Sequence, residues 1–220
     1  MSNRSSMSIP VSPAGFHIKD AETKAGVGSC IKVGSRHKGS DILLDMGMFN
    51  EKLTLSANHV FITHGHIDHI GGCIGHARTK AMSEQIVPTY YVPVETVKLL
   101  EAVRTSSSAL DGHDIKMNIV PLGPGDSVFL NDSTSVKAFQ TVHRVESQGY
   151  AIYSHSSPKS SSTSTSNSRR GGEGGGNSNS SNSSSGGGSS SSSSSDDDGQ
   201  LELVYTGDTV SNNLPTYLPA

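Results

Sequence analysis

A long polar tract limits how much of this 220-residue chain can enter a folded core. From Ser156 to Gly199 the sequence is almost entirely Ser, Gly, Asn and Asp. Such a segment has little apolar surface to bury, so nothing offsets the entropy lost on ordering it. We therefore expect a disordered tract over 156–199, an ordered domain over 14–155, and a continuation of that domain over 200–220. The roughly 175 residues outside the tract suffice for one hydrophobic core.

Composition narrows the class of protein further. A net charge of −3 argues against a strongly basic nucleic-acid binder, although an enzyme that grips RNA at one local patch fits it. The start of the chain is polar and lacks the apolar centre of a secretory signal, and no apolar run reaches the length of a membrane span. Two cysteines cannot form a disulfide framework. We expect an intracellular protein of the cytoplasm, the nucleus or an organelle, without a membrane partner.

Short apolar runs, typical of strands, alternate along the chain with segments whose apolar residues have the spacing of a helix. Helices are expected over Ile70–Gln85 and Val94–Arg104, from apolar residues that recur on one face. Strands are expected at Ser29–Val33, Asp41–Asp45, His59–Ile62, Thr89–Val92, Ile119–Leu122, Val128–Leu130, Val136–Phe139, Tyr150–Tyr153 and Leu201–Tyr205. This interleaving predicts an α/β fold.

Four potential metal ligands lie within six residues after one of these strands. His64 and His66 are two apart, so both imidazoles can project to one side, and Asp68 and His69 follow on a turn. Imidazole and carboxylate are the ligands that catalytic zinc prefers, and two adjacent ions can share a bridging hydroxide. The alternative is a set of surface loop histidines. It is the weaker interpretation, because such a cluster is unlikely to arise by chance. Six isolated histidines are expected to be solvated or hydrogen-bonded: His17, His37, His59, His76, His113 and His155.

The segment from His64 to His69 resembles the HxHxDH signature of the metallo-β-lactamase superfamily. The resemblance implies an αββα sandwich and a metal-dependent hydrolase. It also implies that Asp45 braces the metal loop, although an Asp before Gly47 could equally form a turn. Within this superfamily, HRVESQGY at 143–150 resembles the third metal motif of ribonuclease Z, the tRNA 3′-processing endonuclease, in its short form.

This second resemblance implies site residues, a cofactor and partners. His143 would join His64 and His66 on one zinc ion, while Asp68 and His69 would hold a second. Asp208, in the TGDT segment at 206–209, would bridge both ions. Asp68 would also orient the attacking hydroxide and act as general base. The substrate would be precursor tRNA, from which a 3′ trailer is removed, and the relatives form homodimers.

Two features depart from the ribonuclease Z pattern. The family places a further histidine well after the TGDT motif, whereas no histidine follows His155 here. We therefore expect weaker binding of the second metal and an incomplete sandwich, as in a chain truncated at its C-terminus. Where the family carries a basic tRNA-gripping arm, this chain has the polar tract, which is expected to be either a linker that replaces the arm or an insertion. The alternatives are a hydrolase of a small substrate, such as a cyclic nucleotide or thioester, and an inactive zinc-binding domain.

Overall fold

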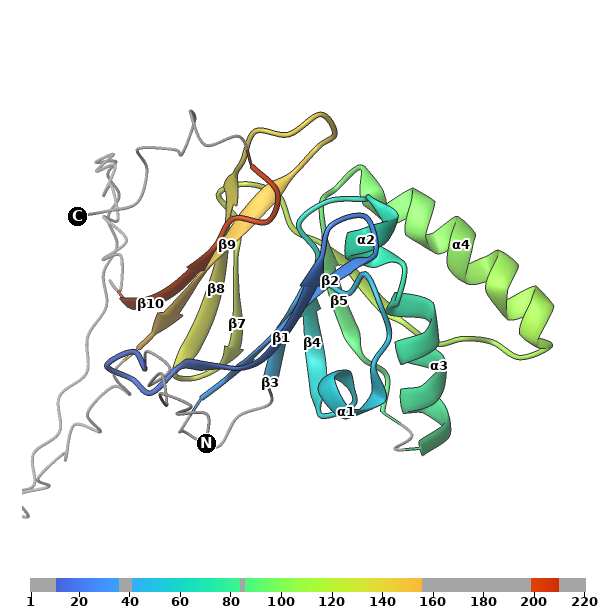
Figure 1. Cartoon of the computed structure of the whole chain (residues 1–220), viewed down its shortest axis with the longest axis horizontal. Helices are drawn as coiled ribbons and strands as arrows, with labels where there is room; N and C mark the ends of the chain where they lie inside the picture. Colours follow the sequence, from blue (N-terminus) through green and yellow to red (C-terminus); the bar gives the residue numbers. More distant parts are fainter. Residues whose placement is uncertain (1–10, 36–40, 84–85, 156–198, 210–220) are drawn as a thin grey trace, which may run out of the picture.

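Figure 1 shows the computed structural model of the chain. It describes residues 11–35, 41–83, 86–155 and 199–209, and all statements below concern these ranges. The predicted disordered tract lies outside the described residues except for Gly199, and so do residues 210–220 of the expected continuation of the domain. No helix of the described part is long and apolar enough to cross a membrane.

Six strands form the first sheet, in the spatial order β1-β2-β3-β4-β5-β6. They are β1 (His17–Lys24), β2 (Gly28–Gly34), β3 (Asp41–Leu44), β4 (Ala57–Phe61), β5 (Thr89–Val92) and β6 (Asn118–Pro121). The first three pair antiparallel, and β3 to β6 pair parallel. Parallel neighbours need long crossover connections, which contain α1 (Glu51–Thr54), α2 (Ile67–Ile70), α3 (Cys73–Ser83) and α4 (Thr96–Asp111).

Four antiparallel strands form the second sheet, in the order β10-β9-β8-β7. They are β7 (Ser127–Asn131), β8 (Thr134–Gln140), β9 (Gln148–Ser154) and β10 (Gln200–Tyr205). Tyr205 of β10 lies opposite Tyr150 of β9, so the segment after the polar tract joins the sheet formed before it. This pairing brings Asp208 back to the part of the fold that carries the histidine cluster.

The central strands are buried on both faces, and alternate residues enter two different cores. Leu43, Val60 and Tyr90 point toward the helices, where they join Cys73, Ala77 and Leu100. Leu44, Phe61 and Tyr91 point toward the second sheet, where they join Val136, Tyr150 and Ile152. Figure 1 shows α3 and α4 on the side of the first sheet that faces away from the second. The α/β class is confirmed, with one helical layer and two facing sheets in the described residues.

Every predicted strand is present, but the helices differ from the prediction. The helix expected over Ile70–Gln85 is divided between the end of α2 and α3, because the chain is bent at Gly71 and Gly72. Residues 84–85 lie outside the described part of the chain. A Cβ on Gly72 would lie 2.6 Å from the backbone carbon of Met48, so the chain passes too close there for a larger residue. The helix expected over Val94–Arg104 is α4. It begins at Thr96, after a turn that contains Pro93, and continues to Asp111.

Two elements were not predicted at all. Strand β1 is almost wholly exposed and polar, so it shows no alternation of apolar and polar residues. Helix α1 is a single turn, too short for a helical pattern to register.

Candidate metal centre

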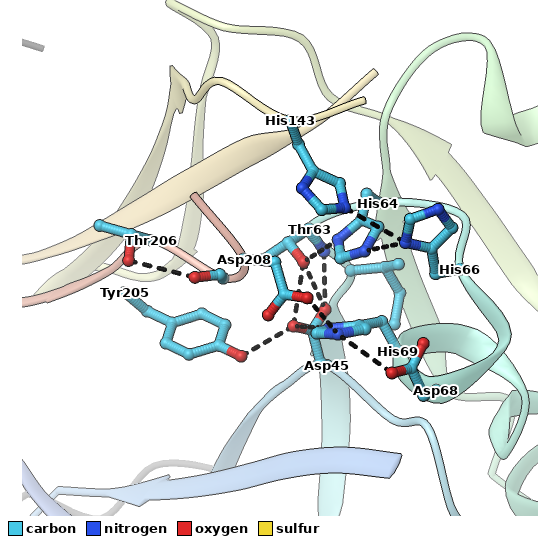
Figure 2. Close-up of polar contacts among 12 residues, drawn as sticks. Asp45, Thr63, His64, His66, Asp68, His69, His143, Tyr205, Thr206 and Asp208 are labelled. Carbon is cyan, nitrogen blue, oxygen red and sulfur yellow. Dashed lines mark hydrogen bonds and ion pairs between the residues drawn. The ribbon is translucent and has the colours of Figure 1, made fainter. Parts of the chain in front are cut away.

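The candidate site lies where several strands of the two sheets end. Asp45 follows β3, and Thr63 and His64 follow β4. These residues lie close together because the carboxyl ends of parallel strands meet at one edge of a sheet. His66 precedes α2, which carries Asp68 and His69 within its single turn rather than on the turn expected. The loop between β8 and β9 supplies His143, and the segment after β10 supplies Asp208. Figure 2 shows these side chains converging.

Three imidazole rings face one another at the first candidate metal position. The Nε2 atom of His64 lies 2.9 Å from Nδ1 of His66, which lies 3.2 Å from Nε2 of His143. Nitrogen ligands of a tetrahedral zinc ion, each 2.0–2.1 Å from the metal, are about 3.3 Å apart. The observed separations are within a few tenths of an ångström of that value. Three inward-facing nitrogens of this kind suit a zinc-type cation.

A second group of possible ligands adjoins the first. The ligand atoms of His64, His69 and Asp208 all lie within 4.8 Å of one another, and His69 Nε2 is 3.5 Å from the Asp208 carboxylate. Asp68 lies next to this group but is not one of its members. Its Oδ2 atom lies 4.0 Å from His69 Nε2 and accepts a hydrogen bond of 3.1 Å from the backbone N–H of Gly26. The three residues expected on a second metal are therefore neighbours, with Asp68 at the outer side.

Asp45 is completely buried and accepts hydrogen bonds from four donors. The backbone N–H of Thr63 donates to Oδ1, and the Thr63 hydroxyl lies 3.0 Å from both carboxylate oxygens. His69 Nδ1 and the Tyr205 hydroxyl each donate to Oδ2 over 2.8 Å. Asp45 also has a positive φ of 59°, as a turn residue would. Both interpretations of Asp45 apply, because it turns the chain and supports the histidine loop.

This hydrogen-bond network determines which nitrogens face the site. The Thr63 hydroxyl donates its only proton to Asp45, so it accepts from His64 Nδ1, 2.9 Å away. His69 Nδ1 donates to Asp45. Both imidazoles therefore carry their proton on Nδ1, and their Nε2 lone pairs point toward the possible metal positions. A carboxylate that orients a metal-binding histidine in this way is a common feature of zinc sites.

The electrostatic surroundings favour the neutral form of the first histidines. Burial, together with the neighbouring His69 and His143 rings, lowers the pKa of His64 to about 4. Partial desolvation and the positive charge of Arg144 also lower the pKa of His66. Burial opposes protonation of His69 as well, but the hydrogen bond and charge of Asp45 outweigh it and raise the pKa of that ring. At neutral pH, His64 and His66 are thus uncharged and able to bind a cation.

The isolated histidines of the described residues lie outside both groups of possible ligands. His76 is buried, with Nδ1 2.7 Å from the Tyr90 hydroxyl, and His155 contacts the Ser135 hydroxyl over 2.7 Å. Both match the expectation of a hydrogen-bonded histidine, whereas His37 lies outside the described residues. Sequence reasoning missed two polar contacts at the site, those of Tyr205 with Asp45 and of Arg144 with His66.

A family model described as a beta-lactamase superfamily domain matches residues 50–160. The chain is 34% identical over 113 residues to tRNase Z TRZ1 of Arabidopsis thaliana, covering 51% of this chain and 40% of that protein. It is 33% identical to nuclear ribonuclease Z of Triticum aestivum, covering 51% and 64%. The chain thus spans less than two thirds of either relative. The crystal structure of human tRNase Z, short form, aligns with a TM-score of 0.46 and 20% identity, over 61% of this chain and 62% of that one.

Proposed function

Because the chain belongs to the beta-lactamase superfamily, we propose that it is a zinc-dependent phosphodiesterase of the ribonuclease Z type, which removes 3′ trailers from precursor tRNA. The observation that carries the proposal is the convergence of three inward-facing imidazole nitrogens, from His64, His66 and His143. The choice of RNA as substrate is supported by relatives named tRNase Z and ribonuclease Z.

Each site residue has a role in this proposal. His64, His66 and His143 would hold one zinc ion. Asp68 and His69 would hold a second, and Asp208 would be a ligand of both. Bound zinc lowers the pKa of a water ligand toward ~7, which supplies hydroxide at neutral pH. Asp68 is the general base, because its carboxylate is partly exposed at the rim and the Gly26 N–H fixes one of its oxygens. Asp45 and Thr63 keep His64 and His69 in the tautomers that present Nε2.

The proposal is tested with a trailer-bearing precursor tRNA and the purified chain loaded with zinc. We expect one cut that leaves a 3′-hydroxyl on the tRNA and a 5′-phosphate on the trailer. The variants His143→Ala and Asp68→Asn should abolish the cut, and His113→Ala, which changes an exposed histidine outside the cluster, should not. Metal content measured by mass spectrometry accompanies each assay.

The other outcomes separate the competing functions. Hydrolysis of bis(p-nitrophenyl) phosphate without a cut in the precursor would overturn tRNA as substrate and favour a small-substrate hydrolase. Bound zinc without any turnover would favour an inactive zinc-binding domain. A folded chain that binds no zinc would overturn the whole proposal.

We further propose that the chain acts as a homodimer in the compartment that supplies its precursor tRNA, in the nucleus, the cytoplasm or an organelle. One relative is named as nuclear, which supports the first of these. Sedimentation equilibrium tests the dimer, since a monomer at assay concentration would contradict it.

A further inference from the structure

Arg144 contacts the candidate metal centre from outside. It directly follows His143 in the loop between β8 and β9, and its side chain is exposed. Its Nε atom lies 3.3 Å from Nε2 of His66. The other nitrogen of the same ring, Nδ1, faces His64 and His143. His66 is therefore contacted by a cation on one side and offers a possible metal ligand on the other.

The contact completes a chain of hydrogen bonds that runs in one direction. Guanidinium N–H groups only donate, so Arg144 requires an unprotonated Nε2 on His66. The proton of neutral His66 then lies on Nδ1 and is donated to His64 Nε2, 2.9 Å away. His64 Nδ1 donates to the Thr63 hydroxyl, which donates to Asp45. All four links agree in direction from Arg144 to the buried carboxylate.

A metal ion on His66 is incompatible with this arrangement. If Nδ1 binds the ion, the proton of the neutral ring must lie on Nε2, where it would meet the Arg144 N–H. Two donors cannot share a hydrogen bond, so Arg144 has to leave His66. Because Arg144 directly follows His143, its side chain remains attached next to a candidate ligand, within reach of the site.

We infer that Arg144 is a substrate-contacting residue: released from His66 when the metal binds, its guanidinium pairs with the phosphodiester of the substrate. This inference rests on the proposed function. A guanidinium offers parallel N–H donors that match two phosphate oxygens. The carboxylates of Asp68 and Asp208 also lie beside His69, and the chain has a net charge of −3. Arg144 supplies positive charge where an anionic substrate has to approach, and thereby favours phosphodiesters over neutral esters.

The first test measures binding of inorganic phosphate to the zinc-loaded full chain by calorimetry. We expect Arg144→Gln to weaken phosphate binding at least about tenfold, the effect of one lost hydrogen bond to a charged group. Arg144→Lys keeps the charge without the fork and should give an intermediate value. Arg78→Gln is the matched control, because Arg78 pairs with Asp111 on another part of the surface, and it should bind phosphate like the wild type. Equal affinities of wild type and Arg144→Gln would overturn the inference.

The second test reads the His66 tautomer by long-range ¹H–¹⁵N NMR of the imidazole rings. In metal-free wild type the proton should lie on Nδ1, and zinc should move it to Nε2. In metal-free Arg144→Gln the preference for Nδ1 should weaken. A proton on Nε2 in the metal-free wild type would contradict the hydrogen-bond chain and overturn the inference. If phosphate binding depends on Arg144 but the precursor is not cut, the inference stands and tRNA as substrate fails.

Discussion

The change Asp45→Asn should damage both stability and metal binding. The asparagine oxygen can still accept the two Thr63 hydrogen bonds, but its NH₂ group replaces the oxygen that accepts from His69 and Tyr205. The Tyr205 hydroxyl can turn to accept from this NH₂ group, whereas the His69 Nδ1–H then faces a donor at a site that is fully buried. At about 1–3 kcal/mol for a buried hydrogen bond that cannot re-form, we expect a loss of about 1–3 kcal/mol. That is a large fraction of the roughly 5–15 kcal/mol that stabilises a typical domain.

His69 can reduce this loss only at a cost to its ligand role. If it accepts from the new NH₂ group, its proton moves to Nε2, the nitrogen that faces Asp208. We therefore expect zinc affinity to fall about 10–100-fold, the usual range for loss of a residue that orients a metal ligand.

Urea unfolding in the presence of chelator gives the stability change, and a zinc competition titration gives the affinity. Asp126→Asn removes the same charge from an exposed turn, where Asp126 accepts from Gly123 N–H over 2.9 Å, and should change stability by less than about 1 kcal/mol. If Asp45→Asn unfolds at the wild-type urea concentration and binds zinc equally well, the assigned role of Asp45 is wrong.

Three further predictions concern other parts of the chain. Tyr205→Phe removes one of four donors from the buried carboxylate, so urea unfolding should show a loss of about 1–3 kcal/mol; an unchanged midpoint would contradict the contact. Burial opposes ionisation of Asp41, but hydrogen bonds from Lys19 and a serine lower its pKa. Its stabilisation is therefore present above the ordinary pKa of 3.8 and lost as pH falls below it, and Asp41→Asn should lack this dependence in urea melts between about pH 5 and 3. Burial raises the pKa of Cys30 to about 12 and that of Cys73 as well, so neither thiol should react with Ellman's reagent at pH 8 until urea unfolds the chain.

The sequence was most informative where a local pattern decides the structure. The strand before Thr63 and the spacing of His64 and His66 predicted a cluster of imidazoles at the end of a buried strand, and the structure has this arrangement. Resemblance to a known family added His143 and Asp208, which lie far along the chain. The structure brings both to the cluster, because β8, β9 and β10 pair in one sheet.

The remaining features depend on tertiary contacts that no local pattern records. The bend at Gly72 exists because the backbone of Met48 passes against it. The hydrogen bond from Tyr205 to Asp45 joins residues 160 positions apart, and that from Gly26 to Asp68 joins a hairpin tip to a helix. Each of these partners is an ordinary residue in its own segment, so only the folded arrangement identifies it as part of the site.

The most direct test of the central claim is a crystal of the zinc-loaded chain, measured at the zinc absorption edge. We predict an anomalous peak within bonding distance of His64 Nε2, His66 Nδ1 and His143 Nε2, with Arg144 no longer in contact with His66. A zinc-soaked crystal with no peak at these three nitrogens would contradict the account.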